Sequence, residues 1–103
     1  MSVRWTQKAV ADLDSIFEAI AVDRPRVAER IIRTLLSHGQ QLLTHPHRGR
    51  PGRLVQTREL SVPRLPYIMV YSLSPSFIDP KPDVTILRVL HGAMQWPPKE
   101  QFH

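Results

Sequence analysis

Four side chains in the second half of the chain have the chemistry needed to cleave RNA: Arg58, Glu59, Arg88 and His91. Cleavage through the 2′-hydroxyl requires a general base, a general acid and cations that stabilise the charge developing on the phosphate. His91 titrates in the range suited to proton transfer, and the arginines would supply the positive charge. Because side chains alternate along a strand, Arg88 and His91 reach one site only if their strand breaks or bulges near Leu90.

Each of these residues also has a structural interpretation. A single histidine at a strand end is more often a hydrogen-bonded structural residue than a catalyst. Arg88 and Glu59 would form a cross-strand ion pair if their strands bring them face to face. The residue types alone therefore leave catalysis and structure open as alternatives.

Positive charge is concentrated in one short segment. The chain has 14 Lys and Arg against 9 Asp and Glu, and residues 45–65 hold five arginines against Glu59 alone. Residues 45–53 contain two Gly and two Pro and no other apolar residue, which predicts an exposed loop. The arginines of this segment other than Arg58 suit phosphate contacts or an acidic protein partner, and they form the candidate target surface: Arg48, Arg50, Arg53 and Arg64.

Metal and thiol chemistry are not expected. His45 and His47 lie two residues apart in the basic loop, and even with His91 they lack a nearby carboxylate, so we predict no metal site and no cofactor. The chain contains no cysteine, which excludes disulfides, thiolate zinc sites and a cysteine nucleophile.

Two helices are predicted in the first half of the chain. Thr6 is a suitable N-cap, and an apolar stripe then runs to about Val22 through Val10, Leu13, Ile16, Phe17 and Ile20, with Asp12, Asp14 and Glu18 on the solvent side. A second helix begins at Pro25, folds back on the first, and keeps its apolar pattern through Leu43. Gly39 inside it indicates close packing or a loosened last turn.

Three β-rich runs follow at residues 57–62, 67–73 and 83–90, with spacings that suit an antiparallel meander. Residues 2–5 suit an edge strand, and Tyr67 and Tyr71 alternate as half-buried residues. The helical hairpin is the only available cover, so we expect one α+β domain over residues 1–103, of order β-α-α-β-β-β. Trp96 lies beyond the regular elements and is a candidate partner contact.

Length and composition indicate the general class of protein to which this chain belongs. The 103 residues are 42% apolar and 22% charged, which is typical of one folded domain. No apolar run is long enough to span a membrane and the N-terminus lacks a signal-peptide pattern, so we expect a cytoplasmic protein.

Several segments together resemble a known family. After a helical hairpin come Gly49-Arg-Pro-Gly-Arg53, Thr57-Arg-Glu-Leu60, Pro66-Tyr-Ile-Met-Val-Tyr71, Ile86-Leu-Arg-Val-Leu-His-Gly92 and Gln95-Trp-Pro97. From Val3 to Pro97 this arrangement is similar to the RelE/ParE superfamily, small toxins of bacterial type II toxin-antitoxin systems that are often called plasmid-stabilisation proteins.

The resemblance implies a toxin neutralised by a cognate antitoxin, with operator DNA contacted only through that antitoxin. RelE-like members cleave mRNA on the ribosome without a metal, whereas ParE-like members inhibit DNA gyrase. The cleaving branch commonly has an arginine where this chain has Ile68, and many relatives have a basic residue where it has Met94. We therefore expect a ParE-like gyrase inhibitor. The alternatives are an mRNA interferase, using Arg58, Arg88 and His91, and a non-toxic corepressor.

Overall fold

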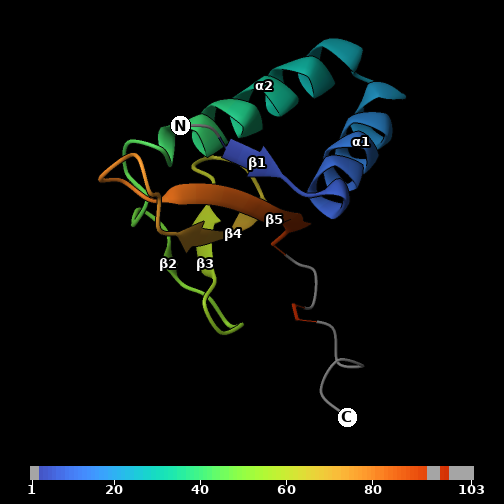
Figure 1. Cartoon of the computed structure of the whole chain (residues 1–103). Coiled ribbons are helices and arrows are strands. Elements are labelled where there is room, and N and C mark those ends of the chain that lie inside the picture. The colour runs from blue at the N-terminus through green and yellow to red at the C-terminus, as the bar shows by residue number, and fades with distance from the viewer. Residues whose placement is uncertain (1–2, 93–95, 98–103) are drawn as a thin grey trace.

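A computed structural model of the protein describes residues 3–92 and 96–97. Two helices lie on one side of a five-stranded sheet, which confirms the predicted α+β architecture (Figure 1). The elements in chain order are β1 (Val3–Trp5), α1 (Gln7–Ala21), α2 (Pro25–Gln41), β2 (Arg50–Pro51), β3 (Arg58–Ser61), β4 (Tyr67–Ser74) and β5 (Asp83–His91). Met94 lies outside the described residues.

The two helices begin where the sequence indicates. Thr6 caps α1, since its hydroxyl accepts a hydrogen bond from the Ala9 N–H at 3.1 Å. Pro25 occupies the first turn of α2, where the missing N–H costs nothing. Close packing explains Gly39, because a Cβ added there would come within 2.7 Å of the Trp5 ring. The apolar pattern of α2 continues beyond the last residue of the helix, and Leu42 and Leu43 are buried in the turn that follows.

Part of the predicted apolar stripe does not enter the core. Val10, Phe17 and Leu36 remain 45%, 37% and 44% exposed, respectively. The hairpin leans across the sheet and its far end extends beyond the strands (Figure 1). Three apolar side chains of the hairpin therefore remain accessible to solvent.

The sheet has the order β1-β5-β4-β3-β2, and all neighbours are antiparallel except β1 and β5. The expected meander is thus confirmed for β3, β4 and β5, while the N-terminal edge strand is parallel. The prediction that residues 45–53 form a loop was wrong in one respect, because Arg50–Pro51 forms strand β2 and pairs with Arg58 and Glu59. Pro51 is tolerated there because β2 is the outermost strand.

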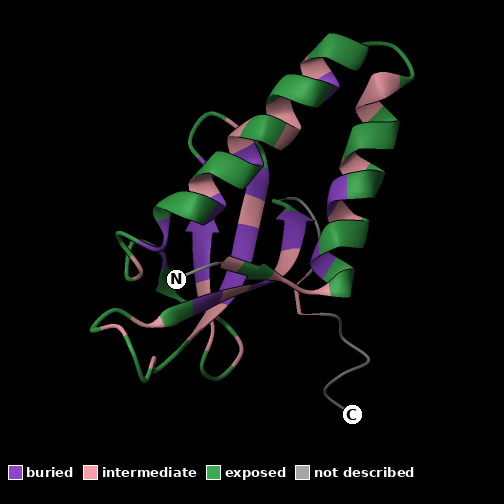
Figure 2. Cartoon of the chain, turned by 45° about the horizontal axis from the view of Figure 1, so that its top comes forward, coloured by how far each residue is buried: buried purple, intermediate pink, exposed green. Residues whose placement is uncertain are grey.

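The core lies between the helices and the central strand β4. Met69 and Tyr71 of this strand belong to this core and are 0% exposed, and purple buried segments concentrate on the strands and on the inner sides of the helices (Figure 2). The prediction that Tyr67 and Tyr71 are half-buried was wrong, since both rings are buried. They lie on the central strand, on the face covered by the helices.

No helix in the described part of the chain is long and apolar enough to cross a membrane.

Candidate functional site

On the side away from β4, no strand of the described residues pairs with the second half of β5, and α1 with its N-cap Thr6 takes that place. β1 pairs only with Val84–Ile86. Beyond it, the Thr6 hydroxyl donates to the Leu87 carbonyl at 2.8 Å, and the Asp12 carboxylate accepts from the Val89 N–H at 2.9 Å. Side chains of α1 therefore satisfy backbone groups that an open sheet edge would leave unpaired.

Arg88 is held at this edge by Asp12. Its Nε and Nη2 donate to the two carboxylate oxygens at 2.7 and 3.0 Å, a bidentate geometry. These hydrogen bonds raise the pKa of Arg88 above its ordinary value, although burial acts in the opposite direction. The alternative pairing of Arg88 with Glu59 was wrong. Each of the two residues lies opposite Val70 of the intervening strand, and Arg88 turns to α1 instead.

Glu59 is the acceptor for a second group of arginines. Its carboxylate is only 2% exposed and accepts from the Arg53 N–H at 2.9 Å. The guanidinium groups of Arg50 and Arg53 lie 3.7 Å from the same carboxylate. Because Glu59 offers one negative charge to two arginines, this part of the surface keeps a positive charge.

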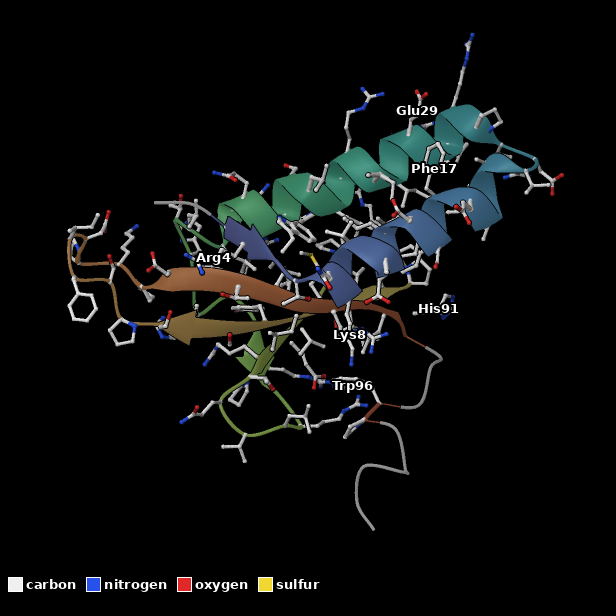
Figure 3. The ribbon with its side chains drawn as sticks, turned by 45° about the vertical axis from the view of Figure 1, so that its right-hand side comes forward. Arg4, Lys8, Phe17, Glu29, His91 and Trp96 are labelled. Carbon is white, nitrogen blue, oxygen red and sulfur yellow. The ribbon has the colours of Figure 1, made fainter. Side chains whose placement is uncertain are left out.

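Trp96 joins the two groups of arginines. Its carbonyl accepts from Arg53 Nη1 at 2.7 Å, and the Arg88 guanidinium lies 5.7 Å from the centre of its ring. Figure 3 shows Trp96 on the side of the sheet opposite the helices, with Lys8 near β5. We call the surface formed by Arg50, Arg53, Arg88 and Trp96 the basic face.

An open cavity of about 450 Å³ borders the basic face. Its lining combines apolar side chains, Leu54, Leu87 and Trp96, with the cations Lys8 and Arg88. This composition suits an acidic segment that also carries an apolar side chain, rather than a reaction that needs a general acid and a general base.

Arg58 anchors the basic loop. Its Nε donates to the Gly49 carbonyl at 2.9 Å and its Nη2 to the His47 carbonyl at 3.2 Å. The Tyr71 hydroxyl holds the same segment, accepting from the Gly49 N–H at 2.9 Å and donating to the Pro46 carbonyl at 2.7 Å. The loop is thus fixed to the sheet by one arginine and one tyrosine.

His91 lies at the end of β5, exposed, with its ring edge-on to Tyr67 at 5.8 Å between centroids (Figure 3). The β-bulge in β5 falls opposite Val70 and Tyr71, before Arg88, so the strand is regular from Arg88 to His91. The side chains of Arg88 and His91 therefore project from opposite faces of the sheet.

The three candidate catalytic residues are not gathered in one place. His91 pairs with Tyr67 and Arg58 with Tyr71, positions about 13 Å apart along β4 at 3.3 Å per residue. Arg58 is engaged with loop carbonyls and Arg88 with Asp12. The fold therefore does not bring Arg58, Arg88 and His91 together around one point, although His91 and Asp12, the partner of Arg88, line the same cavity.

The remaining arginines of the target surface lie apart from the basic face. Arg48 Nη1 donates to the Gln41 side chain at 2.8 Å and lies 3.3 Å from His38 Nδ1. Arg64 is exposed in the turn between β3 and β4, with a positive φ of 66°. Among the described residues, no three His, Cys, Asp or Glu side chains are gathered as metal ligands, and His45 and His47 belong to no such group.

The contact between Arg48 and His38 predicts a measurable titration. Arginine can only donate, so His38 Nδ1 must be unprotonated to accept. Burial, and secondarily the charge of Arg48, lower the pKa of His38 below 6.5. As the pH falls through 6.5, the unfolded chain therefore binds its proton first, and the folded state loses stability down to the lowered pKa.

We expect NMR titration to give a depressed pKa for His38 that rises in Arg48→Ala but stays below the ordinary value, because burial is the larger cause. An unchanged pKa in Arg48→Ala would contradict the role of Arg48.

Asp12 is the residue that the sequence does not reveal. It was expected on the solvent side of its helix, which was wrong, since it is only partly exposed and binds Arg88 and Val89. The one available signal is its place beside Leu13, at the border of the apolar stripe.

Comparisons with known proteins agree over nearly the whole chain. The family described as ParE toxin of the type II toxin-antitoxin system parDE matches residues 3–96. "Putative toxin Y4kP" of Sinorhizobium fredii is 39% identical over 95 residues, 92% of each chain. "Toxin RelE2" of Caulobacter vibrioides is 30% identical over 91 residues, covering 88% of this chain and 94% of that protein.

A solved structure has the same fold. A chain described as belonging to the chromosomal ParDE system of P. aeruginosa superposes with a TM-score of 0.75 and 26% identity, over 88% of this chain and 95% of the other.

Proposed function

Because the chain belongs to the family of ParE toxins of type II toxin-antitoxin systems, we propose that it inhibits DNA gyrase through surface contacts and is neutralised by a cognate antitoxin. The observation that carries the choice of gyrase is the separation of Arg58, Arg88 and His91. Each has a different structural environment: Arg58 binds loop carbonyls, Arg88 binds Asp12, and the His91 ring lies against Tyr67.

The distribution of charge supports a target that includes nucleic acid. Gyrase acts on DNA, so an inhibitor that binds its DNA complex meets both protein and phosphate. The basic face and Arg48 offer guanidinium groups with remaining donors, which suit phosphate contacts without sequence preference. We propose that Arg48, Arg50 and Arg53 make these contacts, with Arg88 as a further candidate, and that Arg64, in the turn between β3 and β4, contacts the target separately.

The antitoxin has two suitable surfaces. The exposed apolar side chains of the helical hairpin, Val10, Phe17 and Leu36, suit the apolar side of an amphipathic helix. The free edge of β1 suits addition of a strand. A net charge of +5 favours an acidic antitoxin, with Trp96 as a candidate contact and with operator DNA bound by the antitoxin rather than by this chain.

Ribosome-dependent mRNA cleavage is the second candidate. The observation in its favour is the 30% identity with the Caulobacter protein named Toxin RelE2. It requires Arg58, Arg88 and His91 to rearrange on the ribosome, because the folded chain keeps them apart.

The test is a pair of assays with the purified protein freed of antitoxin. One measures gyrase supercoiling and trapped gyrase–DNA cleavage complexes, and the other measures mRNA cleavage on translating ribosomes. We expect trapped complexes and intact mRNA. Codon-phased mRNA cuts with unaffected gyrase would contradict the proposal. Normal growth at confirmed soluble expression would instead favour the corepressor.

The loop arginines provide a charge-matched prediction. We expect Arg48→Ser with Arg50→Ser to raise the concentration needed for gyrase inhibition about tenfold, the effect of losing two phosphate contacts. The control is Arg26→Ser with Arg30→Ser on the exposed side of α2, which removes the same charge elsewhere. Equal effects of the two pairs would show that only net charge matters and would remove the loop from the contact surface.

A further inference from the structure

The loop between β4 and β5 presents two neighbouring apolar side chains to solvent. Phe77 is 103% exposed and Ile78 is 91% exposed, the highest values among the large apolar residues that the structure describes. The loop projects at the left of Figure 1, at the opposite end of β5 from His91. Scattered apolar residues on a surface are normal, but an adjacent aromatic and branched pair at a projecting tip is the composition of an interface anchor.

The tip is held in shape by its own contacts. Lys81 Nζ donates to the Thr44 carbonyl at 3.0 Å, which ties the loop to the turn after α2. The Lys81 N–H donates to the Asp79 side chain at 2.9 Å, closing a turn after the apolar pair. The prolines at 75, 80 and 82 fix further backbone angles. An anchor that is already ordered loses less conformational entropy on binding than a flexible one.

The charge at the tip identifies the kind of partner. Asp79 and Asp83 outnumber Lys81, so this end of a basic protein is locally acidic. An acidic tip is repelled by DNA phosphates and by anionic lipid headgroups, whereas an apolar pocket with a neutral or basic rim would accept it. The partner that fits is therefore a protein surface.

We propose that Phe77 and Ile78 are the anchor by which this chain holds its target protein, inserted together into an apolar pocket. This inference rests on the proposed function, because the target is taken to be gyrase. Thr44 leads directly into the basic loop, so Lys81 holds the anchor close to Arg48 and its neighbours. Protein and nucleic acid in one complex could then be contacted from the same end of the molecule.

The test compares two double variants in the full chain. Phe77→Ser with Ile78→Ser removes the anchor. Val22→Ser with Val55→Ser removes two other apolar side chains, which are 81% and 89% exposed. For the anchor variant we expect at least about a tenfold higher concentration for half-inhibition of gyrase supercoiling, since each buried apolar side chain contributes substantially to binding. We expect its melting temperature and its complex with the antitoxin to match those of the wild type, and the control pair to inhibit normally.

Unchanged inhibition by the anchor variant would overturn the inference, and so would loss of antitoxin binding or a changed oligomeric state with normal inhibition. A wild-type protein that leaves gyrase unaffected would overturn the proposed function alone. In that case growth assays of the two variants test the anchor. If only the anchor variant no longer arrests growth, Phe77 and Ile78 anchor the chain to another target. If both variants still arrest growth, the proposed anchor is overturned. A wild-type protein without either effect would overturn both proposals.

Discussion

Asp12→Ala should lower the free energy of unfolding by about 2–3 kcal/mol, in line with the loss of several hydrogen bonds to a charged acceptor. Asp12 accepts from Arg88 twice and from the Val89 N–H once. Its removal leaves an arginine without its counter-ion and a strand amide without its acceptor, at an edge where no other strand of the described chain pairs with β5. Urea denaturation at neutral pH measures the change.

The matched control is Asp14→Ala, which removes an exposed carboxylate from the same helix and should change stability by less than about 0.5 kcal/mol. Arg88→Ala should cost less than Asp12→Ala, because Asp12 keeps its bond to Val89. The double variant completes a cycle that isolates the ion pair, whose side chains are 25% and 17% exposed. A coupling near zero would show that Asp12 acts through the strand amide alone.

This cycle also separates structure from function at Arg88. If Arg88→Ala remains folded but no longer arrests growth, Arg88 belongs to the contact surface as well as to the edge. If the Arg88→Ala variant arrests growth normally, the role of Arg88 is structural, and its ion pair with Asp12 explains why an arginine occurs in this apolar strand.

Tyr71→Phe should lower the free energy of unfolding by about 2 kcal/mol, the expected effect of leaving buried hydrogen-bonding groups unsatisfied. The ring would still fill its place in the core, but the Gly49 N–H and the Pro46 carbonyl would lose the hydroxyl that binds both. The loop should also detach locally, which limited trypsin digestion would detect as faster cleavage after Arg48.

Tyr67→Phe is the natural comparison, because Tyr67 is on the same face of the same strand but at the end away from this loop. It should not accelerate cleavage after Arg48. Equal acceleration in both variants would show that general loss of stability, rather than the tyrosine–loop contact, controls access to the loop.

The elements that the sequence predicts well depend on local patterns. The apolar spacing of α1 and α2, the Thr6 cap and Pro25 place both helices, and alternation places β3, β4 and β5. The residues that it predicts poorly depend on neighbours far along the chain. Asp12 looks like a surface carboxylate until β5 lies beside it, because its partners are 76 and 77 residues away.

The same reason limits the prediction of the candidate site. Arg58 has the residue type of a phosphate ligand, but its contacts with Gly49 and His47 depend on how the loop folds back. The sequence predicts a loop at Arg50–Pro51 because Pro and Gly generally disfavour strands. An edge strand tolerates proline, and β2 is an edge strand. Composition correctly indicates a basic surface, but only the fold separates its arginines into those that hold the structure and those that face solvent.

The parallel pairing of β1 with β5 sets an order of events during synthesis. Val3 is made 81 residues before its partner Val84, an interval of roughly 4–16 s at typical elongation rates. Until then the N-terminal strand has no place to dock, and the Thr6 and Asp12 side chains have no strand edge to bind. A nascent chain therefore cannot complete the sheet before β5 has been made, so the surface around Arg88 forms only after β5 has emerged from the ribosome.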